Sequence, residues 1–367
     1  MTTFSRRNVI RLGAAASAAP FLRLRAQDTG EKRLGIALLG LGDYATKQLG
    51  PALKKTGNAK LTGIVTGSPD KVPVWQKEYG IPDGNVYDYQ NLDKIADNKD
   101  IDVIYVVTPT ALHPEFTIRA LDAGKHVICE KPMAPTAEDC ARMIAAAEKN
   151  KKTLQIGYRL HWDPFHLRLM EAVKTKEFGA WKSIDTSDAS RMMDFTGHNA
   201  WRVDKELGIA GALYDLGVYA VQAALYSAQE HPLRVTAKNW TDRKEEFSEV
   251  PEHWEWELEF SEGRKAKGFA SYGKNGNFVR VETEKGRIEI EPAYGYSGQK
   301  GSTPEGPMPF EHVHQQKLQI EGQVKSILTG EPSRVPGEMG RRDIQVIRGI
   351  MKAAESGKAH DFGKFDY

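Results

Sequence analysis

The chain has 367 residues, enough for two domains that each bury a core. Its 51 Lys and Arg residues nearly balance its 49 Asp and Glu residues, which argues against a nucleic-acid-binding or membrane-binding surface. The 2 cysteines, Cys129 and Cys140, make no disulfide framework, and spacings such as CxxC or HExxH do not occur, so we expect no metal site.

Residues 1–26 have the form of a twin-arginine export signal. The charged start reads SRR at 5–7, and an alanine-rich, weakly apolar segment follows at 9–22. This segment is too short to cross about 30 Å of hydrocarbon, and Arg11 interrupts it. Its glycine and proline disfavour the alternative of an ordinary amphipathic first helix. We therefore predict a periplasmic protein with no membrane association beyond export.

From residue 33 to residue 156, short apolar strands alternate with helical segments. A repeated strand–helix unit with right-handed crossovers gives a doubly wound parallel sheet, the Rossmann fold that binds dinucleotides. The fold class we expect here is therefore α/β. The predicted strands are 34–40, 59–67, 102–109 and 126–132, and the predicted helices are 112–124 and 137–151.

The pattern changes in residues 157–367, where successive strands are joined by short turns such as SEGR and EKGR. We expect an α+β domain with a large, mainly antiparallel, open-faced sheet that serves substrate binding and oligomerisation. A homo-oligomer, dimer or tetramer, follows if that face has to be covered. The predicted helices are 164–176, 312–330 and 339–356, and the strands are about 181–192, 233–240, 252–260, 264–272, 277–284 and 286–291.

The sequence GLGDYA has the pattern G-x-G-x-x-A and lies between the first strand and the first helix. Glycines allow the tight turn and let the backbone approach a pyrophosphate at the helix N-terminus. The alternative is a structural turn without a ligand. The predicted cofactor-binding residues are Gly40, Leu41, Gly42, Asp43, Tyr44 and Ala45.

The end of the second strand indicates which dinucleotide binds. NAD sites usually carry an acid there that holds the ribose 2′-hydroxyl, but this strand ends in TGSPDK, and Asp70 comes four residues too late. Hydroxyl groups with a nearby lysine suit a 2′-phosphate, so the sequence favours NADP over NAD. The residues expected to contact it are Thr66, Gly67, Ser68 and Lys71.

Two later motifs carry the expected chemistry. In AGKHVICEKPMA, Lys131 follows a buried strand at the carboxyl edge of the sheet, where ligands bind, and the bond to Pro132 can be cis. In GALYDLGVY, Asp215 and Tyr219 are four residues apart and share a helix face. An ammonium beside a phenol eases loss of its proton, so Lys131 and Tyr219 predict a pair that moves a hydroxyl proton. The alternatives are a surface lysine, a capping or ion-paired aspartate and a core tyrosine.

With these motifs, and with TPTALH (108–113) and GYR (157–159), the chain resembles the Gfo/Idh/MocA oxidoreductase family over about residues 33–357. Most members carry histidine where this chain has Tyr219, and tyrosine is the pattern of the glucose–fructose and aldose–aldose oxidoreductases. The resemblance places Lys131 at the reacting carbon and Asp215 beside the sugar. It implies cofactor contacts by Thr108, Pro109, Thr110, Leu112, His113, Glu130, Lys131, Arg159, Trp201 and Arg202, and sugar contacts by Lys131, Arg159, Asp215 and Tyr219, to which Tyr296 is added as a candidate.

The predicted export signal limits which reactions the protein can carry out, because an exported enzyme finds no free nucleotide with which to replace a cofactor that it loses. If NADP bound with a nanomolar Kd and associated at about 10⁶ M⁻¹s⁻¹, it would leave at about 10⁻³ s⁻¹, within minutes. We therefore expect a ping-pong reaction in which an aldose is oxidised at C1 to the lactone and a second sugar is reduced, with NADP(H) bound throughout.

Three alternatives remain: a sugar dehydrogenase or reductase with exchangeable NADP, an NAD-dependent glycosidase and a non-catalytic sugar-binding relative. Glucose–fructose oxidoreductases clasp the nucleotide with a long proline-rich N-terminal arm. Here only about six residues separate the predicted signal from the first strand, and in this the chain departs from the pattern of that group.

Overall fold

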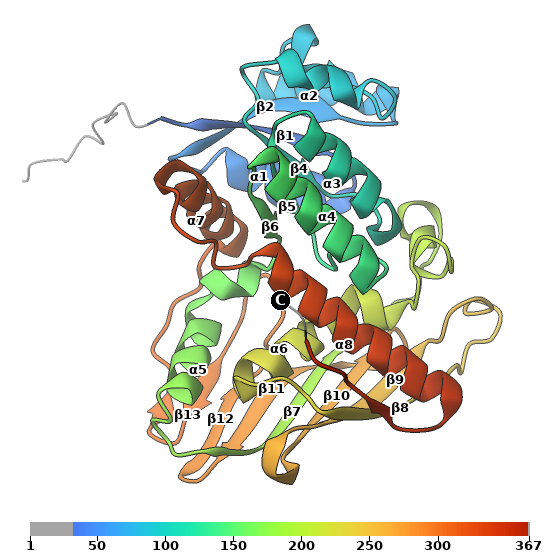
Figure 1. Ribbon diagram of the computed structural model, residues 1–367, viewed down its shortest axis with the longest axis vertical. Helices are drawn as coiled ribbons and strands as arrows, with labels where there is room; N and C mark the ends of the chain where they lie inside the picture. The colour runs from blue at the N-terminus through green and yellow to red at the C-terminus, as the bar shows by residue number, and fades with distance from the viewer. Residues whose placement is uncertain (1–31, 366–367) are drawn as a thin grey trace, which may run out of the picture. The chain divides into compact units, whose positions relative to one another are not determined.

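A parallel sheet forms the first part of the structure, a computed structural model that describes residues 32–365 (Figure 1). Its strands are β1 (Leu34–Leu39), β2 (Ala59–Val65), β3 (Val86–Tyr87), β4 (Val103–Val106), β5 (His126–Cys129) and β6 (Leu154–Ile156). They lie in the order β3-β2-β1-β4-β5-β6, all parallel. The order reverses between β1 and β4, which opens the crevice where doubly wound folds bind ligands. The expected Rossmann sheet is confirmed, and β3 and β6 are additions to the predicted strands.

Helices cover both faces of this sheet, because alternate residues of its strands point to opposite sides. Ala37 and Leu39 belong to one hydrophobic core, and Ile36 and Leu38 belong to another. The helix α4 begins at Thr136, whose hydroxyl accepts a hydrogen bond of 3.0 Å from the amide of Asp139. The elements are η1 (Ala45–Leu49), α1 (Gly50–Leu53), η2 (Pro69–Lys71), α2 (Val72–Tyr79), η3 (Asp83–Asn85), η4 (Leu92–Asp97), η5 (Thr110–Leu112), α3 (His113–Asp122) and α4 (Ala137–Asn150).

A nine-stranded sheet forms the second part. Its strands are β7 (Trp181–Ala189), β8 (Arg234–Trp240), β9 (His253–Glu259), β10 (Lys265–Ser271), β11 (Gly276–Thr283), β12 (Gly286–Ile290), β13 (Gly301–Thr303), β14 (Gly306–Pro307) and β15 (His360–Asp361). The order is β14-β13-β12-β11-β7-β10-β9-β8-β15, and only β7 and β10 pair in parallel. The prediction of a large, mainly antiparallel sheet is therefore confirmed.

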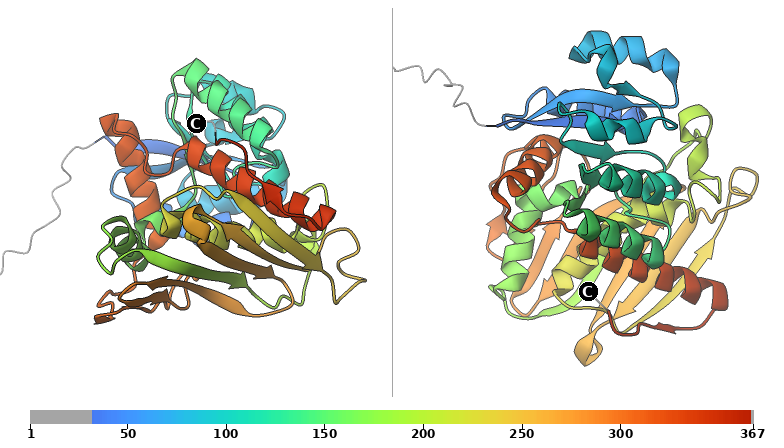
Figure 2. Two further views of the ribbon diagram at one scale, coloured as in Figure 1. Left: turned by 60° about the horizontal axis from the view of Figure 1, so that its bottom comes forward. Right: turned by 45° about the horizontal axis from the view of Figure 1, so that its top comes forward.

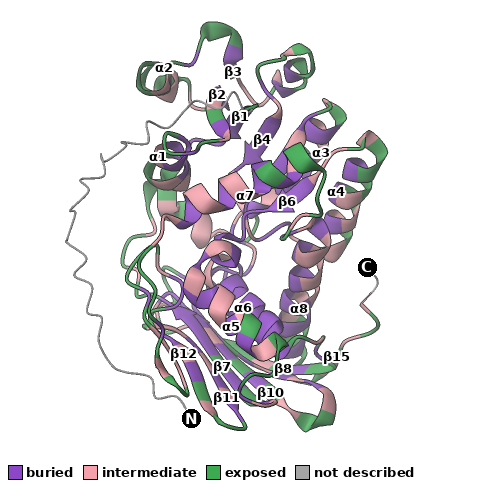
Figure 3. Cartoon of the chain, turned by 90° about the vertical axis from the view of Figure 1, so that its left-hand side faces the viewer, coloured by how far each residue is buried: buried purple, intermediate pink, exposed green. Residues whose placement is uncertain are grey.

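The helices of the second part that pack on this sheet all lie on one face of it (Figures 1 and 3). The opposite face carries no helix of the described chain (Figure 2). No described helix is both long enough and apolar enough to span a bilayer. The predicted export signal lies outside the described residues. The elements are η6 (Arg159–Trp162), α5 (Pro164–Lys174), η7 (Gly197–Arg202), η8 (Leu213–Gly217), α6 (Val218–Ala228), η9 (Ser261–Gly263), α7 (Gln315–Thr329) and α8 (Gly337–Ser356).

The helix α7 belongs to the last part of the chain but packs on the first sheet, where Ile320 and Val324 join the core of Ile36 and Leu38. Buried glutamines along α7 make hydrogen bonds to that sheet. The side-chain amide of Gln319 donates to the Tyr105 hydroxyl at 2.7 Å. A polar helix face thus covers the sheet because its amides find partners in it.

This chain of hydrogen bonds ends beside the predicted reactive lysine. The Tyr105 hydroxyl donates to a carboxylate oxygen of Glu130 at 2.6 Å, and the other Glu130 oxygen accepts from the Lys131 amide at 3.1 Å. An added Cβ on Gly157 would lie 2.4 Å from the same Glu130 carboxylate, so only glycine fits there. The backbone at Lys131 is therefore held from α7 through Tyr105 and Glu130.

Tyr105→Phe is expected to lower the free energy of unfolding by about 1–3 kcal/mol, because Glu130 and Gln319 both lose a partner in a buried place. Chemical denaturation of the mature protein measures the change. Tyr79→Phe is the matched control, since the Tyr79 hydroxyl makes no hydrogen bond among the described residues. A loss no larger than that of the control would contradict this role of Tyr105.

Candidate active site

A cleft of about 370 Å³ lies at the carboxyl edge of the first sheet. Its walls come from the turns after β1, β2, β4 and β5, and from η7, η8 and α6 of the second part. The nucleotide turn and the candidate catalytic residues therefore face one space. The predicted site residues that line it are Gly40, Leu41, Gly42, Asp43, Tyr44, Thr66, Ser68, Lys71, Thr108, Pro109, Thr110, Glu130, Lys131, Trp201, Arg202, Asp215, Tyr219 and Tyr296.

Some predicted residues do not line this cleft, and some lining residues were not predicted. The predicted residues outside the lining are Ala45, Gly67, Leu112, His113 and Arg159, and the additional lining residues are Tyr89, Val107, Pro132, His198 and Asn199. Chain neighbours of the motifs, such as Val107 and Pro132, follow from the motifs themselves. Tyr89 and Asn199 carry no pattern in the sequence that points to a site.

The turn after β1 fits a dinucleotide. Gly40 has a φ of +98°, and an added Cβ there would lie 2.7 Å from the Val107 carbonyl oxygen. Gly42 has no atom within 4 Å of the place of a Cβ, so the backbone faces open space. The buried hydroxyl of Thr108, also in the lining, has no hydrogen-bond partner. A bound nucleotide can supply that partner and can approach the turn closely at Gly42.

The end of β2 offers hydroxyl groups and a lysine to the same cleft. The Thr66 hydroxyl accepts from the Ser68 amide at 3.0 Å, and the Lys71 ammonium donates to the Leu41 carbonyl at 2.8 Å. Lys71 therefore joins the end of β2 to the nucleotide turn. The carboxylates that line the described cleft are Asp43, Glu130 and Asp215, and none of them is at this end of β2.

Lys131 reaches from the first sheet to the second part of the molecule. Its ammonium donates to the Asp215 carbonyl at 2.9 Å, lies 3.8 Å from the Asp215 carboxylate and is 4.5 Å from the centre of the Tyr219 ring. Burial by itself lowers the pKa of Lys131, but Tyr219, Asp215 and other neighbours outweigh it and raise the pKa above the ordinary value. Lys131 therefore remains a cation, and its bond to Pro132 is cis.

The carboxylate of Asp215 is held by two further donors. One of its oxygens accepts from Arg202 Nε and from the Tyr272 hydroxyl, both at 2.9 Å. Burial works against ionisation, but Arg202 and Lys131 outweigh it and lower the pKa of Asp215. Asp215 is thus an anion that holds Lys131 and Arg202 at the cleft. Tyr272 ends a predicted strand and carries no sequence signal for this role.

Arg159 lies behind the cleft wall, and its side chain is 2% exposed. Its guanidinium is 5.0 Å from the centre of the Tyr219 ring and 4.8 Å from that of Tyr296. It also donates to Gln315 of α7. The resemblance implied direct contact of Arg159 with cofactor or sugar; here Arg159 places the two aromatic rings that line the cleft.

His113 is also turned away from the cleft. It is 1% exposed, and its ring nitrogens lie 2.9 Å from the carbonyl oxygens of Pro132 and Thr108. Burial lowers the pKa of His113 to about 4, so the ring is neutral near pH 7. The residue joins the loops after β4 and β5, both of which line the cleft.

Asp188 of β7 is a buried acid that the sequence analysis missed. Burial raises its pKa to about 7, although Lys131 and Arg159 act in the opposite direction. These charges show that the carboxyl group is near the reactive groups. A charged residue inside a predicted strand, on the strand face that also carries Ile184, is a signal that would have identified it.

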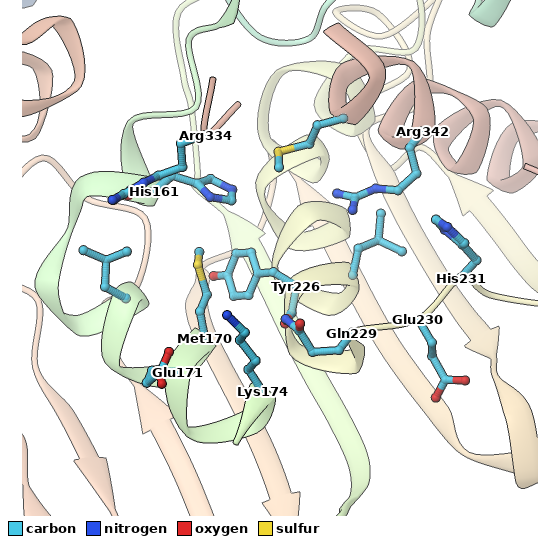
Figure 4. Close-up of a pocket in the computed structure, with 13 residues that line it drawn as sticks. His161, Met170, Glu171, Lys174, Tyr226, Gln229, Glu230, His231, Arg334 and Arg342 are labelled. Atoms are coloured by element: carbon cyan, nitrogen blue, oxygen red, sulfur yellow. The ribbon is translucent and has the colours of Figure 1, made fainter. Parts of the chain in front are cut away.

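A second cavity, of about 570 Å³, lies between α5, α6 and α8 (Figure 4). It shares no lining residue with the cleft, and no predicted site residue lines it. His161 and Tyr226 form part of its wall (Figure 4). The nucleotide turn and the Lys131 cluster therefore identify the smaller cleft as the candidate active site.

Known proteins resemble this chain over nearly its whole length. The aldose–aldose oxidoreductase of Caulobacter crescentus is 37% identical, with a TM-score of 0.86, and the match covers 90% of this chain and 100% of that one. The NADP-dependent D-xylose 1-dehydrogenase of Haloarcula marismortui is 25% identical over 340 residues, 90% of this chain and 93% of the relative. A second NADP-dependent D-xylose 1-dehydrogenase, from Haloferax volcanii, is 26% identical over 330 residues, which cover 88% of this chain and 98% of that relative.

Two family models match consecutive parts of the chain. The model of the oxidoreductase family with an NAD-binding Rossmann fold matches residues 34–158, which contain the nucleotide turn and Lys131. The model of the GFO/IDH/MocA C-terminal domain matches residues 166–289, which contain Asp215 and Tyr219. Together they match more than half of the residues, and the chain therefore belongs to the Gfo/Idh/MocA family of NAD(P)-binding oxidoreductases.

Proposed function

We propose that this chain is an exported sugar oxidoreductase that keeps NADP(H) bound. It oxidises an aldose at C1 to the lactone and reduces a second sugar, a ketose or an aldose, in a ping-pong reaction. The observation that carries the proposal is that Lys131, Asp215 and Tyr219 line the same cleft as the nucleotide turn. The 37% identity with an aldose–aldose oxidoreductase supports the substrate class.

A nicotinamide cofactor held at the nucleotide turn would supply the redox chemistry, namely uptake of the hydride of the first sugar and its delivery to the second. Tyr219 takes the proton of the C1 hydroxyl and later gives it to the carbonyl oxygen of the second sugar. Only the phenolate form of Tyr219 can take this proton, and the Lys131 ammonium and the Arg159 guanidinium, 4.5 and 5.0 Å from its ring centre, stabilise the negative charge of that form. Asp215 acts through Lys131 and Arg202, which it holds toward the cleft.

The choice of NADP rests on the end of β2. Thr66, Ser68 and Lys71 line the cleft there without a carboxylate that would repel a 2′-phosphate. Both xylose dehydrogenase relatives are NADP-dependent. Export to the periplasm rests on the sequence of residues 1–26. A redox-neutral reaction suits that compartment because it needs no free nucleotide.

A second candidate is a sugar dehydrogenase with exchangeable NADP. The two D-xylose 1-dehydrogenase relatives favour it, since they match most of the chain. The same residues would serve the same oxidation at C1. The two candidates differ in whether turnover needs added nucleotide.

We also propose a homo-oligomer that covers the outer face of the nine-stranded sheet. Charged side chains of both signs alternate on this face, for example Lys265 with Glu257 at 2.5 Å and Lys238 with Glu255 at 3.2 Å. A twofold pairing of the face with a second copy can set acidic groups against basic ones.

The decisive experiment uses purified mature protein without added nucleotide. Glucose alone is expected to produce the absorbance of reduced nicotinamide in an amount equal to the subunits, and fructose or a second aldose is expected to reverse it. The nucleotide released by heat should be NADP. No rise, with activity only after NADP is supplied, would establish the exchangeable dehydrogenase instead.

Lys131→Met is expected to lower kcat by about 10²-fold or more while bound nucleotide is retained, because the nucleotide turn is unchanged. Steady-state rates and the nucleotide content of the purified variant measure the two effects. Lys94→Met is the control, since Lys94 is exposed in η4 outside the cleft. Normal turnover of Lys131→Met would show that the catalytic assignment is wrong.

Asp188 influences the charge around Lys131 and Arg159, because a protonated carboxyl leaves their positive charges undiminished. A pKa near 7, raised from 3.8, makes the folded state hold this proton between pH 4 and pH 7, where the unfolded chain has lost it. The contribution of Asp188 to the stability of the wild type therefore falls with rising pH in this interval.

The free energy of unfolding of Asp188→Asn is expected to rise by about 2 kcal/mol relative to that of the wild type as the pH increases from about 5 to about 7. The reason is that the amide does not titrate. Urea denaturation at several pH values measures the difference. Asp70→Asn, a substitution at an exposed position, is the control. A difference that does not change with pH would contradict the raised pKa of Asp188.

A further inference from the structure

A segment of the second part crosses to the nucleotide turn of the first. It contains η7 and forms part of the yellow-green stretch in Figure 1. Nε2 of His198 lies 3.2 Å from a carboxylate oxygen of Asp43, the fourth residue of GLGDYA. The two residues are more than 150 positions apart in the chain, so the contact spans the cleft between the two parts.

Both ends of this segment are anchored in the second part. Before η7, the ring of Phe195 packs on Phe247 and Tyr272, with centres 4.9 and 5.5 Å away. At the end of η7, Arg202 binds the Asp215 carboxylate through Nε and donates to the Asn199 side chain at 2.6 Å. Residues 195–202, hereafter the strap, therefore have fixed ends and a middle that lies over the cleft.

The tip of the strap contacts Asp43, an acidic residue of the nucleotide turn. The negative charge of Asp43 by itself would repel the pyrophosphate that this turn receives. The Lys47 ammonium, 2.6 Å away, and to a smaller extent His198 hold the pKa of Asp43 below its ordinary value. Asp43 is thus an anion whose charge the Lys47 ammonium compensates, and His198 and Asn199 line the cleft beside it.

We propose that the strap retains the dinucleotide, with His198 and Asp43 closing it over the nucleotide turn. A ligand at the turn then lies between Gly40–Asp43 and the strap, and its release requires the His198–Asp43 contact to open. The proposal rests on the proposed function in that it contributes to the long retention an exported enzyme needs. It assigns this task to a segment within the second part, not to an N-terminal arm.

The test is the dissociation rate of NADPH, measured without turnover. Protein loaded with NADPH is mixed with excess NADP, and the loss of bound-NADPH fluorescence is followed. His198→Ala is expected to raise the rate about fivefold, which is the range of a single exposed polar contact. Asp43→Asn tests the other side of the contact.

The control variant is His312→Ala, an exposed histidine outside the cleft lining, and thermal melts check that each variant is folded. If His198 acts through Asp43, adding His198→Ala to Asp43→Asn should have no further effect on the rate. An independent effect of the second substitution would overturn the contact as the closing element.

The outcomes separate the two proposals. Slow release from the wild type with unchanged release from His198→Ala would overturn the strap and leave the retained cofactor intact. Fast release from the wild type, faster still in His198→Ala, would support the strap and overturn retention as the basis of the ping-pong reaction.

Discussion

The site depends on the link between Lys131 and Asp215. The lysine stands at the end of β5 in the first sheet, and the aspartate lies in η8 over the second sheet, yet the ammonium donates to the Asp215 carbonyl at 2.9 Å. A buried cation needs such partners, because an isolated charge in a low-dielectric place is costly. The two parts of the molecule therefore have to meet at this point for Lys131 to be charged and oriented, and the cleft is the space that their meeting leaves.

The surroundings of this link are arranged so that each charge has a partner. The carboxylate of Asp215 accepts hydrogen bonds from Arg202 and Tyr272. It therefore keeps the Arg202 guanidinium at the cleft while its own charge is paired. On the other side, α7 reaches Glu130 through Tyr105 and reaches Arg159 through Gln315. One helix of the last part of the chain thus positions both the backbone at Lys131 and the cation beneath Tyr219. Such a network is rigid only when all its members are satisfied.

The strap and Asp188 give the site its two adjustable features. The His198–Asp43 pair is exposed and weak by itself, which suits an element that has to open when the nucleotide is loaded. Burial raises the pKa of Asp188 to about 7, so a modest change of pH alters a charge that interacts with Lys131 and Arg159. Neither residue belongs to a motif. Both gain their significance from neighbours that are distant in the chain.

The sequence by itself determined the doubly wound sheet, the nucleotide turn and the candidates Lys131, Asp215 and Tyr219. These depend on local properties: apolar runs buried on both faces, a left-handed turn that only glycine adopts at position 40, and the four-residue helical spacing. The same rules gave strands of the second part close to those observed, since alternation and short turns are local too. They missed β3, β6 and β13–β15, whose two or three residues each are too short to form a pattern.

Only the tertiary structure decided which predicted residues face the cleft. His113 and Arg159 belong to motifs that surround the site, but both are turned into the protein, where carbonyl groups and aromatic rings hold them. From the sequence alone, the glutamine-rich face of α7 would be predicted to face solvent. In the structure its side chains make hydrogen bonds to the first sheet. The His198–Asp43 contact, too, can be recognised only once the structure shows which residues lie together. Pairing between distant residues depends on how two sheets pack, and no local spacing in the chain encodes that packing.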